Sequence, residues 1–145
     1  MTFENYIKGL LVAYVVDTAY HYGGTDAMFA VAQVLKNRVD AGWCGGDWLA
    51  VIHSAPEYTG TENCSNKLFD HRDLTFRKLL SQIDDIYYGS ADDSNVNITD
   101  DTGTHRALYY AELHNINRVW FKQNILNDLK SHRRLTQVSQ LTFFA

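Results

Sequence analysis

The carboxylate side chains are the groups in this chain whose chemistry could cleave a covalent bond. Cleavage of a glycosidic bond needs a carboxylic acid that protonates the leaving oxygen, often a glutamic acid in an apolar pocket that raises its pKa. The chain contains only four glutamates, Glu4, Glu57, Glu62 and Glu112. Asp17 lies among apolar residues near the end of a predicted helix, where burial could shield an acid from water. An exposed carboxylate near a helix end is the alternative interpretation of Asp17, and the residue pattern alone favours it.

Motifs for other kinds of catalysis are missing from the sequence. It has no glycine-rich phosphate loop, no His-Glu-x-x-His metal helix and no Gly-x-Ser-x-Gly elbow. The six histidines form no ligand pair at helical spacing in a strong helix, so we expect surface or capping roles for them. The acidic stretch at residues 90–103 has oxygen ligands that could bind calcium, but its spacing does not match a helix–loop–helix calcium site. We therefore expect a solvated loop there, and neither a metal nor a cofactor.

Charge and hydropathy narrow the classes of partner. The net charge is −4 and no long basic run is present, which argues against a broad nucleic-acid-binding face. The short basic cluster at residues 130–134 is expected to be a solvated face. No stretch is long and apolar enough to cross a membrane, and no charged leader precedes a cleavage site, so we expect neither a membrane span nor a signal peptide. Cys44 and Cys64 could form one disulfide, although two free thiols are expected in a reducing cytoplasm.

The elements that would position these groups are organised around a central apolar helix at about residues 26–41. Its apolar residues recur at three- and four-residue steps, which is typical of a buried helix face. Thr25 or Asp26 can cap its first turn, and Gly42 can end it in the left-handed conformation. Asn37 and Arg38 interrupt the apolar run. Because buried polar side chains need partners, we expect these two to tie neighbouring loops to the helix.

The remaining segments complete a single domain, residues 1–145, of the α+β class and mainly α. A first helix at residues 3–20 precedes the glycine pair Gly23-Gly24, which predicts a turn and a helical hairpin. The other predicted elements are a short helix at 48–53 capped by Asp47, a helix at 70–88 capped by Asp70 and ended by Gly89, an extended segment at 107–113, a helical piece from 119 to about 130, and a final strand at 136–144.

Several short segments, taken in order, carry a family resemblance. Residues 30–39 form an apolar helix that ends in Asn-Arg-Val, and residues 51–53 read Val-Ile-His. Later segments are Glu57-Tyr58-Thr59, Thr102-Gly103-Thr104, Tyr109-Tyr110, Trp120 and residues 138–144. Their shared order and spacing resemble the SleB-type cell-wall hydrolases, whose lysozyme-like domains cleave peptidoglycan in spores, bacteria and phages. The resemblance covers most of the chain, from the first helix to the last strand.

The chain departs from this family at the expected catalytic acid. The family carries a glutamate at the end of its first helix, within Glu-Ala-x-Gly-Glu. Counting back from Asn37 without gaps places Ala19 at that glutamate and Gly23 at the second one, and neither side chain can transfer a proton. A two-residue shift in the turn would bring Asp17 to the catalytic position. Alternatively, Glu57 could reach the cleft from the opposite loop.

The resemblance implies a lysozyme-like domain that processes peptidoglycan, in a phage virion or in the host cytoplasm before lysis. If active, it would cleave the glycan strand as a muramidase or a lytic transglycosylase, with Asp17 and Glu57 as candidate catalytic residues. The candidate substrate-binding residues are Tyr58, Thr59, Tyr109 and Tyr110. The alternative is a catalytically inactive structural or adaptor component that binds other phage proteins. A third hypothesis is a small regulatory or inhibitor protein unrelated to cell walls.

Overall fold

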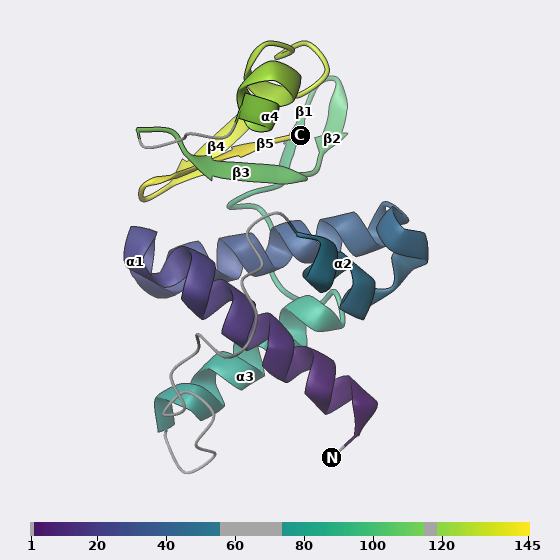
Figure 1. The fold of residues 1–145 in the computed structure, drawn as a ribbon, viewed down its shortest axis with the longest axis vertical. Helices are drawn as coiled ribbons and strands as arrows, with labels where there is room; N and C mark the ends of the chain where they lie inside the picture. Colours follow the sequence, from purple (N-terminus) through teal and green to yellow (C-terminus); the bar gives the residue numbers. More distant parts are fainter. Residues whose placement is uncertain (1, 56–73, 115–118) are drawn as a thin grey trace.

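The chain folds into a helical part and a β part that lie against each other (Figure 1). The structure is a computed structural model that describes residues 2–55, 74–114 and 119–145. The predictions for Glu57, Tyr58, Thr59, Cys64 and Asp70 therefore lie outside the described residues. The elements confirm the predicted class, mainly α with a few short antiparallel strands. No helix in the described ranges is long and apolar enough to span a membrane.

Helix α1 (Phe3–Asp40) provides both of the first two predicted helices, joined by a kink. The helix begins at Thr2, whose side chain accepts a hydrogen bond from the backbone N–H of Asn5 at 3.1 Å. Gly23 and Gly24 leave helical geometry, and Gly24 has φ 64° and ψ −146°, a conformation open essentially to glycine alone. The two halves diverge from this point in Figure 1. The predicted glycine turn is therefore confirmed, as a kink within one helix.

The second half of α1 is the central core helix that the apolar pattern predicts. Val31, Val34 and Leu35 are completely buried there, and they pack in one cluster with the first half of α1. Helix α2 (Trp48–Ser54) and helix α3 (Leu74–Tyr87) cover this cluster. Burial of each large apolar side chain contributes about 1.5–3 kcal/mol to folding, so this cluster supplies most of the stability of the helical part.

The predicted cap at Asp47 and the predicted glycine stops are also confirmed, whereas the side chains of Thr25 and Asp26 cap no helix in the described residues. The Asp47 side chain accepts a hydrogen bond from the Leu49 N–H at 3.1 Å and begins α2. Gly42 and Gly89 have φ of 85° and 80° where α1 and α3 end. A short 3-10 turn, η1 (Trp43–Gly46), links α1 to α2 and carries Cys44, whose thiol is free and exposed.

A polar cluster fastens α3 to the start of α1. The ammonium of Lys8 donates to the Tyr88 hydroxyl at 3.0 Å, lies 2.9 Å from the Asp84 carboxylate, and sits 4.5 Å from the centroid of the Tyr88 ring. Tyr88 in turn donates to the carboxylate of Glu4. Burial alone would lower the pKa of Lys8, but the hydrogen bonds to Tyr88 and Asp84 and the charge of Asp84 outweigh it and raise the pKa to about 12.

The β part contains a three-stranded antiparallel sheet in the order β3–β5–β4, built from β3 (Tyr109–Glu112), β4 (Arg134–Val138) and β5 (Leu141–Phe144). The central strand β5 is buried on both faces, because Phe143 packs with the α1 core while Phe144 packs with Phe121 and Ile125. The predicted extended segment at 107–113 is confirmed by β3. The predicted single strand at 136–144 is wrong, since it turns back at Ser139.

Helix α4 (Val119–Phe121) and the π-helical turn η4 (Lys122–Leu126) cover the side of the sheet that faces away from α1 (Figure 1). Helical structure was expected to continue to about residue 130. It ends earlier, because the Asn127 N–H bonds back to the Lys122 carbonyl at 3.1 Å, five residues away, and widens the last turn.

Residues 90–97 of the acidic segment form a loop, as predicted, whereas the remainder of the segment does not. It folds into a second hairpin, β1 (Ile98–Asp100) and β2 (Gly103–His105), in which Thr99 faces Thr104. Asp100 makes the hairpin turn through hydrogen bonds from the N–H and hydroxyl of Thr102, at 2.9 and 2.6 Å. Such Asx turns compete with water for the carboxylate and order the chain locally.

Candidate functional site

Asp17, the first candidate acid, lies in the first half of α1, about two turns before the kink. Its side chain is half-buried, and Ala19, two residues further on, is completely buried. Glu57, the second candidate acid, and its neighbours Tyr58 and Thr59 lie in the part of the chain that the structure does not describe. The structure therefore places one of the two predicted acids, on the helix where the prediction put it.

Gly23, which aligns with the second glutamate of the SleB-type motif, is closed in by the turn between β4 and β5. A Cβ added at Gly23 would lie 2.5 Å from the Cβ and 2.7 Å from the Oγ of Ser139, closer than packed atoms can approach. The Gln140 N–H also donates to the Tyr22 carbonyl at 3.1 Å, which fastens the same turn to the kink. A glutamate at position 23 would therefore collide with the hairpin. Ala19, which aligns with the first glutamate, is completely buried in the core.

The two adjacent tyrosines of β3 point to opposite faces of the sheet, as strand geometry requires. Tyr110 is 4% exposed, shares a hydrogen bond of 2.6 Å with the Tyr14 hydroxyl, and stacks on Phe143. It fixes the sheet to α1 and offers no surface to a glycan strand. Tyr109 lies on the other face and is half-buried.

Tyr109 is the centre of a group of rings, which we call the aromatic cluster: Trp43, Tyr109, Trp120 and His132. The ring centroids of Trp43 and Trp120 lie 5.6 and 6.3 Å from that of Tyr109, and the His132 ring meets it edge-on at 5.1 Å. Trp120 is 55% exposed, so the cluster reaches the surface. The guanidinium carbon of Arg38 lies 5.0 Å from the Trp43 ring centroid and adds a cation–π contact.

Asn37 and Arg38 do connect loops to the central helix, as predicted. The amide of completely buried Asn37 donates to the Asn97 side chain at 2.7 Å and to the Ala107 carbonyl at 2.8 Å, and it accepts from Gln33 at 3.1 Å. The Arg38 Nε donates to the Leu108 carbonyl at 2.8 Å. These bonds set the position of the segment between β2 and β3.

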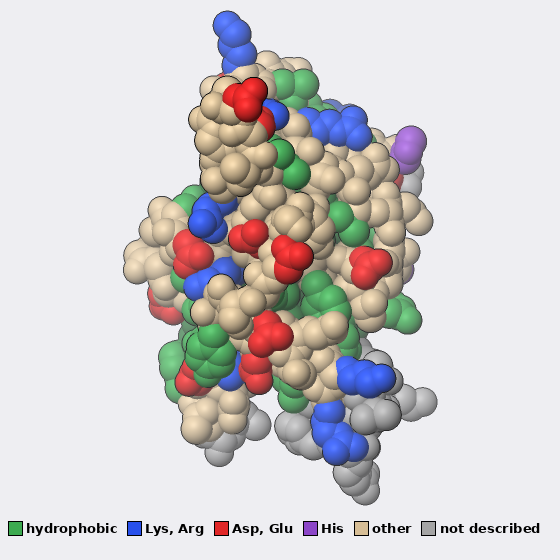
Figure 2. Space-filling view, turned by 180° about the vertical axis from the view of Figure 1, so that it is seen from behind, with side chains coloured by type: hydrophobic (Ala, Val, Ile, Leu, Met, Phe, Trp, Pro, Cys, Tyr) green, Lys and Arg blue, Asp and Glu red, His purple; other side chains and the backbone are tan. Residues whose placement is uncertain are grey.

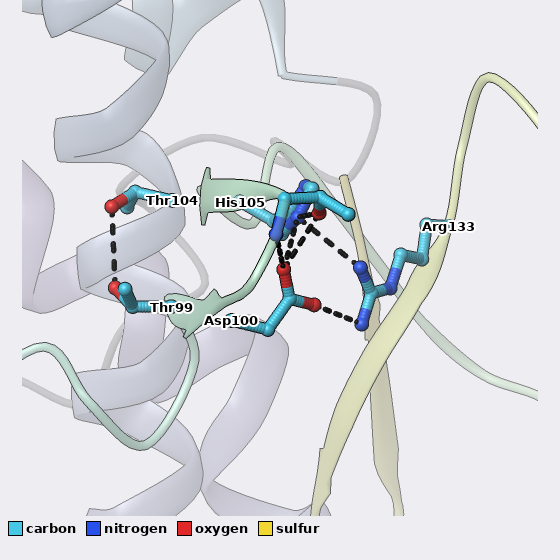
Figure 3. A network of polar contacts seen from close by, with 6 residues as sticks. Thr99, Asp100, Thr104, His105 and Arg133 are labelled. Atoms are coloured by element: carbon cyan, nitrogen blue, oxygen red, sulfur yellow. Dashed lines mark hydrogen bonds and ion pairs between the residues drawn. The ribbon is translucent and has the colours of Figure 1, made fainter.

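A charged network joins the β1–β2 hairpin to the segment before β4 (Figure 3). The Asp100 carboxylate lies between His105 and Arg133, with Oδ1 3.2 Å from the His105 Nε2 and Oδ2 2.6 Å from a guanidinium nitrogen of Arg133. Hydrogen bonds from Thr102, and then the one from Arg133, hold the pKa of Asp100 well below its usual range. Four of residues 130–134, Arg133 among them, are exposed, as the predicted solvated face requires, and the charge of Arg133 is in addition paired with Asp100.

The order of contacts in this network excludes a nucleophile–base–acid triad. In such a triad the carboxylate binds one ring nitrogen of histidine and the nucleophile binds the other. Here Thr102, at 2.7 Å, and Asp100 both contact the same nitrogen, Nε2, of His105, and a nitrogen of Arg133 lies 3.1 Å from it as well. Thr102 therefore has no separate base to activate it, and the network serves to hold the hairpin.

Sequence analysis missed this network because its members are far apart in the chain. The Asp-x-Thr pattern at residues 100–102 was the local signal for a turn, yet nothing local pairs Asp100 with Arg133. Among the described residues, no group of three or more histidine, cysteine, aspartate or glutamate side chains is placed to hold a metal ion. On the face seen in Figure 2, lysine and arginine side chains are scattered among acidic and uncharged ones rather than merged into one basic area.

Comparison with known proteins identifies no relative of this chain. No protein-family model matches it, and neither a curated protein nor a solved structure gives a match. Its resemblance to the SleB-type hydrolases therefore rests on the motifs of its own sequence, and the site must be judged by its geometry.

Proposed function

We propose that this chain is a catalytically inactive structural or adaptor component of a phage virion, built on the scaffold of a SleB-type cell-wall hydrolase. The observation that carries the proposal is the closed position at the kink of α1. Ala19 and Gly23 stand where the family has its two glutamates, and the Ser139 turn occupies the space that a side chain at position 23 would need.

The closure is a packed contact and not a chance proximity of two loops. Strand β5 is buried along its whole length, and strand β4 is paired with it from Arg134 to Val138, so the turn between them cannot be displaced without disturbing the sheet. Forcing extra atoms into a packed site costs about 1–3 kcal/mol. A hydrolase that used the second glutamate of the motif would need this space for its side chain.

The aromatic cluster supports a binding role for the same scaffold. Trp120 and its neighbour Val119 are 55% and 62% exposed, on an element that covers the sheet. Aromatic side chains with an adjacent guanidinium are enriched at the centres of protein–protein interfaces. The cluster is therefore the surface that we assign to contact with another virion protein.

The test is release of soluble muropeptides from purified peptidoglycan, with the unmutated protein beside Asp17→Asn and Glu57→Gln. We expect no release from any of the three, although all are folded by circular dichroism. A matched measurement is co-purification with virion proteins, which Trp120→Ala should weaken and the exposed substitution Leu129→Ala should leave unchanged. Muropeptide release that Asp17→Asn or Glu57→Gln abolishes would overturn the proposal.

The second candidate function is cleavage of the glycan strand with Asp17 as the acid. It is favoured by one observation, the half-buried position of Asp17 on α1, in the helix where the family has its acid. An aspartate reaches less far than a glutamate, and it would have to act from before the kink. Release that is lost in Asp17→Asn but kept in Glu57→Gln would establish this function.

A further inference from the structure

A cavity of about 640 Å³ lies between the end of α1 and the β part. Ligand sites for small molecules usually have volumes of about 300–1,000 Å³. Three segments form its walls: the end of α1 and its cap, the stretch from the end of β2 toward β3, and the chain on either side of the β4–β5 hairpin. The lining residues are Asn37, Asp40, Ala41, Thr104, His105, Arg106, Leu108, Ser131 and Ala145.

The walls carry opposite charges that do not neutralise each other. Asp40, on the α1 wall, forms an ion pair with Lys36 at 3.0 Å, one turn back on the same helix. Arg106, on the opposite wall, makes no hydrogen bond or ion pair with any residue in the described ranges. Both line the same cavity, and neither is the other's partner.

The polarity of each wall extends beyond its charged residue. The C-terminal end of α1 places the negative end of the helix dipole beside Asp40, which favours a cation there. On the other wall, Thr104 and His105 precede Arg106, and Ser131 adds a hydroxyl near them. The network of Asp100 and Arg133 holds the His105 ring in place, and the Thr104 hydroxyl is bonded to that of Thr99 at 3.2 Å.

We propose that this cavity binds a small zwitterion of the amino-acid class, with its ammonium group on Asp40 and its carboxylate on Arg106. A simple anion would meet the carboxylate of Asp40, and a simple cation would meet the guanidinium of Arg106, so each would lose on one wall what it gains on the other. A guanidinium matches a carboxylate with two parallel hydrogen bonds. This inference does not depend on the proposed virion role.

The experiment uses three matched probes in NMR titrations of the full chain: alanine, alaninamide, which lacks the carboxylate, and N-acetylalanine, which lacks the ammonium. We expect alanine to bind about tenfold more tightly than either analogue, which corresponds to about 1.4 kcal/mol for each lost charge contact. The shifted resonances should be those of the lining residues.

Two substitutions assign each charge to its wall. Arg106→Gln should reduce alanine binding to the level of alaninamide, and it should not weaken the binding of alaninamide, because that cation makes no favourable contact with Arg106. Asp40→Asn should likewise reduce alanine binding to the level of N-acetylalanine. Arg134→Gln is the control, because it removes an exposed arginine of β4 that does not line the cavity.

Alanyl-alanine distinguishes the two sources of such a ligand. Tighter binding of this dipeptide, with the same dependence on Arg106 and Asp40, would identify a peptide end, and tighter binding of alanine would identify a free amino acid. Equal binding of all three alanine probes, no binding of alanine, or binding that neither substitution changes would overturn the proposal. Circular dichroism of each variant checks that loss of binding is not loss of folding.

Discussion

Two polar networks hold the β part of this protein in place, and they differ in burial and in charge. The Asn37 network is made of buried amide and carbonyl groups, and it reaches a single charge, the part-buried carboxylate of Asp93, through the Asn97 side chain at 3.0 Å. The Asp100 network is charged, and the side chains of Asp100 and Arg133 are 30% and 46% exposed. A buried polar group that loses its partner cannot turn to water, whereas an exposed one can. Burial, more than charge, should therefore decide which network matters for stability.

Replacement of Asn37 should have the largest effect. Asn37→Leu leaves Gln33, Asn97 and the Ala107 carbonyl without their buried partner, and we expect a loss of about 3 kcal/mol in the free energy of unfolding. Urea titration followed by circular dichroism measures it. Gln123→Leu, an exposed polar-to-leucine change on η4, is the control and should be nearly neutral. A loss below about 0.5 kcal/mol for Asn37→Leu would show that burial does not decide which of the two networks contributes more to stability.

Lys8 sharpens the comparison, because it is a buried charge with more exposed partners. Lys8→Met keeps the apolar stem but removes the contacts to Tyr88 and Asp84, and the half-exposed Asp84 can return to water. We expect the free energy of unfolding to fall by about 1 kcal/mol, less than for Asn37→Leu and more than for a replacement of Arg133 in the Asp100 network. The same urea titration checks it. A loss as large as that of Asn37→Leu would mean that charge weighs as much as burial.

The pH dependence of this contact follows from the raised pKa of Lys8. Because the folded pKa, about 12, exceeds that of the unfolded chain, about 10.4, the contribution is complete below about pH 10 and disappears as the pH rises through 12. The stability difference between the unmutated protein and Lys8→Met should shrink over that interval. A difference that stays constant up to pH 12 would contradict the assignment.

Replacement of Arg133 should have the smallest effect and the strongest dependence on salt. Arg133→Gln removes an exposed ion pair, so the midpoint of thermal unfolding should fall slightly in dilute buffer and by less in concentrated salt. Differential scanning calorimetry at two ionic strengths measures both. A decrease that is the same at both ionic strengths would indicate that Arg133 acts through packing.

Acid should reveal the Asp100 network in another way. The pKa of the Asp100 carboxyl is lowered in the folded state. Its contribution to the stability of the fold is therefore present above the unfolded pKa, about 3.9, and is lost as the pH falls further. Asp100→Asn should therefore lower stability at neutral pH and approach the unmutated protein in acid. A stability difference between Asp100→Asn and the unmutated protein that is the same at all pH values would contradict this role of the Asp100 carboxylate.

The helical part could be predicted from the sequence because its signals are local. The apolar stripe of the central helix, the cap at Asp47 and the glycine stops each act within a few residues. Asn37 and Arg38 were recognised as structural ties because polar residues in an apolar run need partners. Their partners, 60 to 71 positions further along the chain, could not be named from that pattern.

The β part and the site were harder to predict for the opposite reason. The turn that splits the last predicted strand has Ser139 at φ 51°, a position usually marked by glycine or asparagine. The closure of Gly23 by Ser139 joins residues more than a hundred positions apart, and the hydrogen bond between Tyr14 and Tyr110 joins residues 96 positions apart. The absence of both motif glutamates was visible in the sequence, but the loss of space at Gly23 was not. The family resemblance stays a prediction.

The contact between Gly23 and Ser139 also bears on how easily the chain could evolve toward catalysis. A glutamate substituted at position 23 would meet the hairpin, and a change of the turn alone would introduce no carboxylate there. Each step is unproductive without the other, so a population would have to cross an intermediate that is destabilised or has gained nothing. The turn at Ser139 therefore makes the gain of a carboxylate at this position depend on two coordinated changes.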